Sequence, residues 1–92
     1  MKFLVIMRMK EENVIKTRER GAKMKTPFKL EGNFLFPMHV IVGTNSAFFV
    51  VETDKIEDFV RLTYPLTDLV TFETRPIMDN SELMKFAQSE KL

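Results

Sequence analysis

The stretch that decides the fold lies in the middle of the chain, where residues 33–53 are NFLFPMHVIVGTNSAFFVVET. Two apolar runs, 33–42 and 47–53, flank the turn-forming string Gly-Thr-Asn-Ser at 43–46. Runs of this length that are rich in Phe and Val and bounded by turn residues are typical of β-strands. The stretch therefore predicts a β-hairpin.

Further strands and helices are predicted on both sides of this hairpin from apolar periodicity and helix-start signals. In chain order they are a strand at 3–9, a helix at 11–20, a basic loop at 21–28, the hairpin, a helix at 54–64, a strand at 69–78 and a short helix after Asp79. The order β-α-β-β-α-β-α indicates one α+β domain over residues 1–92, since 92 residues leave no room for a second core.

Each predicted helix is expected to turn an apolar stripe toward the sheet. The expected stripes are Val14, Ile15, the Arg18 stem and Ala22 in the first helix, Ile56, Phe59, Val60 and Thr63 in the second, and Leu83, Phe86 and Ala87 in the third. Asp54 and Asp79 are each followed three residues later by Glu, so both are predicted to cap a helix N-terminus as in a capping box.

Two observations predict a ferredoxin-like βαββαβ fold. The segments 3–6 and 12–15 have similar counterparts 45 residues later, as expected for a fold of two βαβ halves. Pro37 and Pro76 lie in predicted strands two and four, and proline favours edge strands because it cannot donate to the ladder. The antiparallel order 4-1-3-2 of this fold places both strands at the edges.

The strands are apolar on both faces, as in Leu4-Val5-Ile6-Met7 and Phe48-Phe49-Val50-Val51. A sheet with helices on one face and water on the other alternates apolar and polar residues instead. A chain this short has helices for only one face. The pattern therefore predicts that a second copy covers the other face in a homodimer.

Composition excludes several kinds of site. The chain has no cysteine, which excludes disulfides, thiolate catalysis and Cys-ligated zinc or iron–sulfur centres. One histidine cannot supply several metal ligands, so neither a metal nor a cofactor is predicted. No stretch is long enough to span a membrane, and Arg8 interrupts the first apolar run too early for a signal peptide. The expected location is cytoplasmic.

The charge of the chain is unevenly distributed. Residues 1–30 hold nine Lys or Arg and three Glu, a net +6, whereas residues 31–92 hold five Lys or Arg and ten Asp or Glu, a net −5. The basic residues are densest at 16–29, where Phe28 is the only aromatic residue that could stack on a base. A solvated basic segment is predicted, and nucleic-acid binding is not.

Four strings carry a family resemblance: FPMH at 36–39, AFFVVETD at 47–54, YPL at 64–66 and FETRPI at 72–77. They resemble domain-of-unknown-function family 3303 in the dimeric α+β barrel superfamily. The resemblance implies a homodimer whose two sheets close into a barrel, with a cavity in each protomer's half. It implies no single reaction, because the superfamily includes cofactor-free monooxygenases, lactone isomerases, haem enzymes and proteins without known activity. The segment 16–29 departs from the relatives in being shorter and more basic.

His39 is the candidate catalytic residue, since histidine titrates near neutral pH and can act as a general base in a cavity. The alternative is a hydrogen-bonded histidine at a strand edge or interface. The candidate ligand-binding residues are Arg8, Glu52, Tyr64 and Glu73. Arg8 and Glu73 are expected to pair across neighbouring strands, because charges within apolar strands are usually paired.

Three functions stay open at this stage. The first is binding of a small, mostly apolar molecule in the cavity of the dimeric barrel, walled by Phe, Met, Val and Leu. The second is a cofactor-free isomerase or monooxygenase that uses His39 as its base. The third is a regulatory or stress-associated interaction module with a filled core and no ligand.

Overall fold

The computed structural model describes residues 1–24 and 32–92. Its elements are β1 (Lys2–Met9), the 3₁₀ turn η1 (Glu11–Asn13), α1 (Val14–Lys23), β2 (Phe34–Ile41), β3 (Ser46–Glu52), α2 (Ile56–Thr63), η2 (Tyr64–Leu66), β4 (Val70–Ile77) and α3 (Asn80–Ser89). The predicted order of strands and helices is confirmed. The first helix, however, runs three residues past the predicted end at Arg20, and the rest of the predicted basic loop, from residue 25, lies outside the described residues.

The four strands form one antiparallel sheet in the order β2-β3-β1-β4, which confirms the predicted 4-1-3-2 order. Pro37 lies in edge strand β2 and Pro76 in edge strand β4, as predicted. Pro37 also lies in a bulge. Phe36 pairs with Val50 and His39 with Phe48, so β2 advances three residues where β3 advances two, and β2 holds one extra residue.

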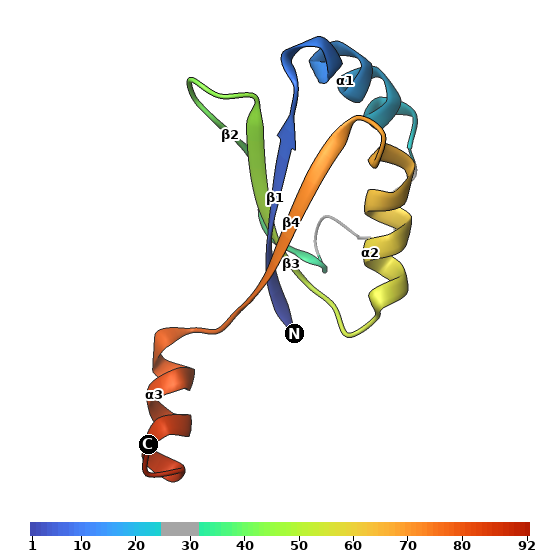
Figure 1. Cartoon of the computed structure of the whole chain (residues 1–92). Helices are drawn as coiled ribbons and strands as arrows, with labels where there is room; N and C mark the ends of the chain where they lie inside the picture. The colour runs from blue at the N-terminus through green and yellow to red at the C-terminus, as the bar shows by residue number, and fades with distance from the viewer. Residues whose placement is uncertain (25–31) are drawn as a thin grey trace.

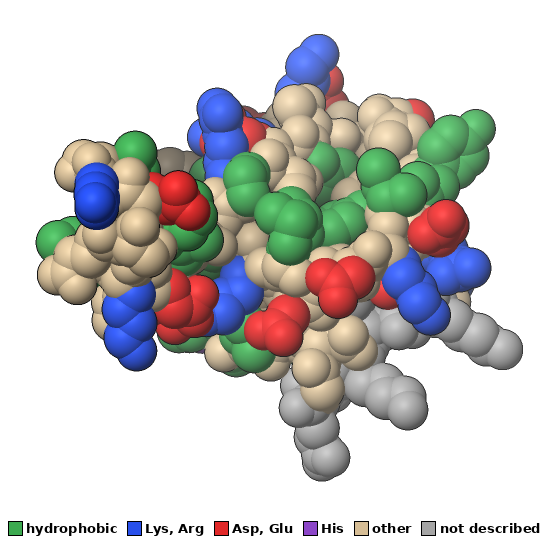
Figure 2. Space-filling model, turned by 90° about the horizontal axis from the view of Figure 1, so that it is seen from below, with side chains coloured by type: hydrophobic (Ala, Val, Ile, Leu, Met, Phe, Trp, Pro, Cys, Tyr) green, Lys and Arg blue, Asp and Glu red, His purple; other side chains and the backbone are tan. Residues whose placement is uncertain are grey.

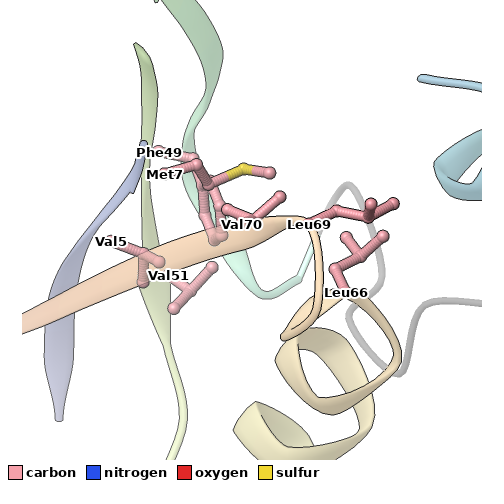
Figure 3. Close-up of a cluster of buried hydrophobic side chains, with 7 residues drawn as sticks. All are labelled: Val5, Met7, Phe49, Val51, Leu66, Leu69 and Val70. Carbon is pink, nitrogen blue, oxygen red and sulfur yellow. The ribbon is translucent and has the colours of Figure 1, made fainter. Parts of the chain in front are cut away.

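One face of the sheet is covered by α1 and α2 (Figure 1). Alternate residues of the two central strands point to this face, and Val5, Phe49 and Val51 are at most 1% exposed there. Leu66 and Leu69, from the connection between α2 and β4, pack onto them (Figure 3). Burial of these side chains stabilises each of them by about 1.5–3 kcal/mol relative to solvent exposure, so this cluster is the core of the chain.

The opposite face carries no helix in the described part of the chain (Figure 1). We call it the open face. Cross-strand partners in an antiparallel sheet share a face, and the register therefore places Ile6 between Phe48 of β3 and Glu73 of β4. The next row holds Leu4 between Val50 and Arg75. The open face is thus apolar along β1 and β3 and charged along β4.

Helix α3 lies away from both faces, beyond the end of β4 (Figure 1). It forms a lobe at one side when the molecule is viewed from that end (Figure 2). The prediction that Leu83 and Phe86 face inward is wrong within one chain, because they are 48% and 51% exposed. The radius of gyration, 15.3 Å, exceeds the value of about 12 Å expected for a compact domain of this length. Since α3 packs on no core of its own chain, it makes the molecule elongated.

The inward faces of the other two helices also differ from the prediction. Ile15 of α1 and Ile56 of α2 are 68% and 73% exposed, whereas Thr17 is buried and Leu62, outside the predicted stripe, packs against the core. Phe59 packs against the core as predicted. Each helix is rotated about its axis relative to the prediction. The way a helix approaches the sheet decides which side is buried, and local periodicity does not define that approach.

The predicted capping boxes are not formed. Asp54 accepts a hydrogen bond from the amino group of Met1 at 2.7 Å, and the carboxylate of Asp79 bonds Lys2. Thr53 takes the place of Asp54 at the start of α2, because its hydroxyl accepts from the Lys55 amide and donates to the Asp58 carboxylate. Within the described residues, no helix is long and apolar enough to cross a membrane.

Candidate functional site

A cavity of about 420 Å³ lies between α1 and the covered face of the sheet. We call it the α1 pocket. Its described walls are Val14, Thr17, Arg18 and Gly21 of α1, Met24 after it, Met7, Met9, Phe34, Met38, Val40, Ser46, Ala47, Phe49 and Phe72 of the sheet, Thr44 and Asn45 of the β2–β3 turn, and Leu62 and Leu66. This volume falls in the range of about 300–1,000 Å³ that small-molecule sites occupy.

Small side chains create the space. The side of α1 that faces the pocket carries Val14, Thr17, Arg18 and Gly21, at the i, i+3, i+4, i+7 spacing of one helix face. A Cβ atom added at Gly21 would meet no heavy atom within 4 Å. Across the pocket, β3 contributes Ala47 beside the large Phe49. The pocket exists because large side chains are missing on facing elements.

Anchors at both ends hold α1 over the sheet. Near its C-terminal end, Arg20 donates to the Pro65 carbonyl at 3.0 Å and to the Asp68 carboxylate at 2.5 Å. The hydrogen bond from Arg20 holds the pKa of the Asp68 carboxyl below its usual range. At the other end, the Asn13 amide donates to the Leu69 carbonyl at 3.5 Å. Both anchors run to the α2–β4 connection, so they place the helix without filling the space toward β2 and β3.

The walls are mostly apolar and adaptable. Four of the seven methionines of the chain, Met7, Met9, Met24 and Met38, line the pocket. Methionine has three rotatable bonds and a polarisable sulfur, and it therefore adjusts to ligands of different shape. The aromatic rings of Phe34, Phe49 and Phe72 supply rigid surface beside them. The composition of the wall is therefore apolar, with both flexible and rigid side chains.

Polar groups are few and lie at two places. Thr17 and Arg18 come from α1, Thr44 and Asn45 from the β2–β3 turn and Ser46 from the start of β3. The Thr17 hydroxyl donates to the Asn13 carbonyl at 2.7 Å. The Thr44 hydroxyl is already engaged, because it donates to the Ile41 carbonyl at 2.8 Å and accepts from the Ser46 amide. Among the described residues, no three His, Asp or Glu side chains are grouped so that they could hold a metal ion.

His39 does not line the α1 pocket. It pairs with Phe48 across β2 and β3, on the open face, and its ring stacks on that of Phe36. The Nδ1 atom of His39 lies 2.7 Å from the carbonyl oxygen of Pro37. Since a carbonyl oxygen only accepts, Nδ1 is the donor of this hydrogen bond. The catalytic role of His39 stays a prediction, now attached to the open face.

The predicted pair of Arg8 and Glu73 is present. The Arg8 Nη2 and Glu73 Oε2 atoms are 3.6 Å apart, and Arg75 donates to the other carboxylate oxygen at 3.3 Å. The three side chains form a charged cluster on the β1–β4 side of the open face. With Arg8 about half exposed and Glu73 a third exposed, the cluster contributes little to the stability of one chain.

The other two candidate residues lie elsewhere. Glu52 is exposed at the end of β3, opposite Lys2. Tyr64, at the start of η2, is 73% exposed and does not line the α1 pocket. The structure therefore brings together Arg8 and Glu73 but groups neither Glu52 nor Tyr64 with His39 in a pocket.

The sequence of the whole domain decides its family. Residues 1–91 match the family described as a domain of unknown function, DUF3303. The chain belongs to the DUF3303 family. No curated protein sequence matches it. The predicted family is thus confirmed.

Sequence reasoning missed two pocket residues of this DUF3303 chain, Thr17 and Gly21. Thr17 stands outside the predicted inward stripe of the first helix, and Gly21 stands at the start of the predicted basic loop, whereas Val14 and the Arg18 stem are predicted to face inward. A signal was present, since Thr17 and Gly21 are small residues four apart on one helix side, opposite the small Ala47 in a strand of large residues. Small residues on facing elements indicate either close packing or a cavity, and the backbone separation decides between them.

Proposed function

We propose that this protein is a homodimer that binds a small, mostly apolar molecule in the α1 pocket of each protomer. The observation that carries the ligand proposal is the pocket itself: about 420 Å³ bounded by four methionines and three phenylalanines. A cavity of this size, lined by apolar side chains with a few polar groups, has the composition of a small-molecule site.

The open face supports the homodimer. It exposes apolar side chains along β1, β3 and β2, including Phe36 at 41% and Ile41 at 39% exposure. Apolar side chains also reach the surface between charged ones on the side viewed in Figure 2. Exposed apolar surface of this extent is typical of an interface, and a second copy offers a matching face. Burial of both open faces against each other would form the predicted barrel, with the α1 pockets outside the sheets.

The enzyme alternative depends on His39 and on a second site. His39 and the α1 pocket lie on opposite faces of the sheet, so one ligand cannot contact both within a protomer. A reaction at His39 would therefore take place in the barrel interior between two open faces. The binding proposal needs no such site, and it is the function that the pocket geometry favours. The cytoplasmic location stays a prediction.

Methyl NMR of the methionines tests the ligand proposal directly. Protein labelled with ¹³C at the methionine methyl groups is titrated with octan-1-ol, an uncharged apolar probe. We expect the resonances of Met7, Met9, Met24 and Met38 to shift with saturation, while those of Met1, Met78 and Met84, which lie outside the pocket, stay in place. Shifts of all seven, or of none, would contradict the proposal.

A pair of variants provides the control. Gly21→Leu adds a side chain in the open space of the pocket, whereas Ala22→Leu adds the same side chain to an exposed position of the same helix. Gly21→Leu should abolish the methyl shifts and Ala22→Leu should leave them unchanged. If both variants bind octan-1-ol like the wild type, the ligand does not occupy the α1 pocket, and the interaction-module alternative gains support.

A further inference from the structure

Among the described residues that line the α1 pocket, Arg18 is the one charged side chain. It lies on the pocket face of α1, between Thr17 and Gly21, and the residue is exposed overall. An arginine in this position lays its aliphatic stem along apolar surface and keeps its guanidinium at the water boundary. In this arrangement the stem contacts the apolar walls and the charge stays at the solvent-facing edge of the pocket.

The guanidinium of Arg18 has no acidic partner in the described part of the chain. The other four arginines all have one: Arg8 and Arg75 pair with Glu73, Arg20 with Asp68 and Arg61 with Asp58. Nor is there an Asp or Glu among the wall residues that the structure describes. A positive charge beside an apolar cavity, with its planar fork of donors engaged by no described carboxylate, is suited to bind an anionic group.

The polar residues at the β2–β3 end of the pocket carry no charge that could attract an ionic ligand. Thr44 and Asn45 of the β2–β3 turn and Ser46 at the start of β3 are neutral, and the hydroxyl of Thr44 is engaged by the turn. A cationic ligand would find no counter-charge among the described walls. A neutral ligand would leave Arg18 unused.

We infer that the ligand of the α1 pocket is an apolar monocarboxylate, whose hydrocarbon part contacts the methionine and phenylalanine walls and whose carboxylate binds Arg18 at the solvent-facing edge of the pocket. This inference rests on the proposed function and deepens it by naming the chemical class of the ligand. Arg18 is then the residue that selects acids over alcohols and amines of the same shape.

Three probes of equal chain length test the inference: octanoate, octan-1-ol and octylammonium, each titrated against methionine-methyl-labelled protein at neutral pH. Octanoate is expected to bind about tenfold more tightly than octan-1-ol, the ratio that one partly exposed charge-assisted hydrogen bond gives. Octylammonium should bind more weakly than octan-1-ol, because Arg18 repels it.

Two variants assign the preference to one side chain. Arg18→Gln should reduce octanoate affinity to that of octan-1-ol and leave octan-1-ol unchanged. Lys23→Gln removes the same charge from the same helix at a position outside the pocket, and it should keep the preference. A wild-type midpoint of urea denaturation shows that each variant is folded.

The outcomes separate this inference from the proposed function. Equal affinity of wild type for octanoate and octan-1-ol, or a preference for octanoate that survives Arg18→Gln, overturns the carboxylate inference and leaves the pocket proposal standing. If none of the three probes shifts the pocket methionines, the proposed function fails, and the inference fails with it.

Discussion

The imidazole ring of His39 lies against the phenyl ring of Phe36, with ring centroids 4.3 Å apart and planes 21° from parallel. Phe48 of β3 stacks beside them, 5.9 Å from His39 and 5.7 Å from Phe36. The bulge at Pro37 brings Phe36 and His39 to the same side of the sheet, although they are three residues apart in one strand. These three rings form an aromatic cluster on the open face.

This cluster predicts the effect of His39→Ala. The variant should lose ring stacking worth about 0.5–1.5 kcal/mol of the free energy of unfolding, measured by urea denaturation. Binding of octan-1-ol to the α1 pocket should stay within about twofold of wild type, because His39 does not line it. Val42→Ala, at a 93% exposed position, is the control and should change neither. Loss of pocket binding in His39→Ala, with stability unchanged, would favour the site role that the sequence predicts for this histidine.

The homodimer is tested by light scattering. We expect a mass of twice 10.8 kDa for the wild type at micromolar concentration. Phe48→Glu places a carboxylate in the centre of the open face, where burial against a second copy costs several kcal/mol, and should give the mass of one chain. Val42→Glu adds the same charge at the exposed β2–β3 turn and should stay dimeric. A wild-type monomer would remove the barrel from the proposal.

The attachment of α3 is predicted to depend on pH through Lys2 and Asp79. Their side chains are 2.9 Å apart, and the hydrogen bond lowers the pKa of the Asp79 carboxyl below its usual 3.8 and raises the pKa of the Lys2 ammonium above its usual 10.5. The ion pair is therefore present at pH values between the pKa of Asp79 and the pKa of Lys2. It is lost as the pH falls through the depressed pKa of Asp79 or rises through the raised pKa of Lys2. The methyl resonance of Met84, within α3, should report both transitions.

Asp79→Asn removes this pair at neutral pH. Amide hydrogen exchange across residues 80–89 should then become faster, while exchange in β1 and β3 stays unchanged. Glu90→Gln, at the other end of α3, is the matched control, since Glu90 has no ion pair among the described residues. Equal exchange in both variants would mean that contacts other than the Lys2 pair hold the helix.

Much of the sheet was predictable, because its determinants are local. Proline cannot donate to a ladder, so Pro37 and Pro76 alone indicated which strands are the edges. The hairpin followed from turn chemistry at 43–46. The Arg8–Glu73 pair followed from charges in strands that the predicted order makes neighbours.

The pocket was not predictable, because it depends on distances between elements. The periodicity of α1 fits several rotations of the helix, and the one that buries Thr17 is set by contacts of Arg20 and Asn13 with the α2–β4 connection, more than forty-five residues away. The capping errors have a similar cause. Asp54 and Asp79 have suitable spacing, but Met1 and Lys2, brought close by the sheet, bind their carboxylates instead.

The last prediction uses two glycines in opposite conformations. Gly21 lies in α1, where glycine costs about 0.5–1 kcal/mol relative to alanine, and a Cβ atom there would meet nothing within 4 Å. Gly21→Ala should therefore raise the free energy of unfolding by about that amount and leave most of the pocket open. Gly43, in the β2–β3 turn, has a φ of 87°, a conformation that costs an alanine about 1–2 kcal/mol. Gly43→Ala should lower stability although it too meets no neighbouring atom. Urea denaturation measures the free energy of unfolding of both variants and so compares helix propensity at Gly21 with backbone strain at Gly43. A loss of stability in Gly21→Ala would contradict the open space beside Gly21 that defines the α1 pocket.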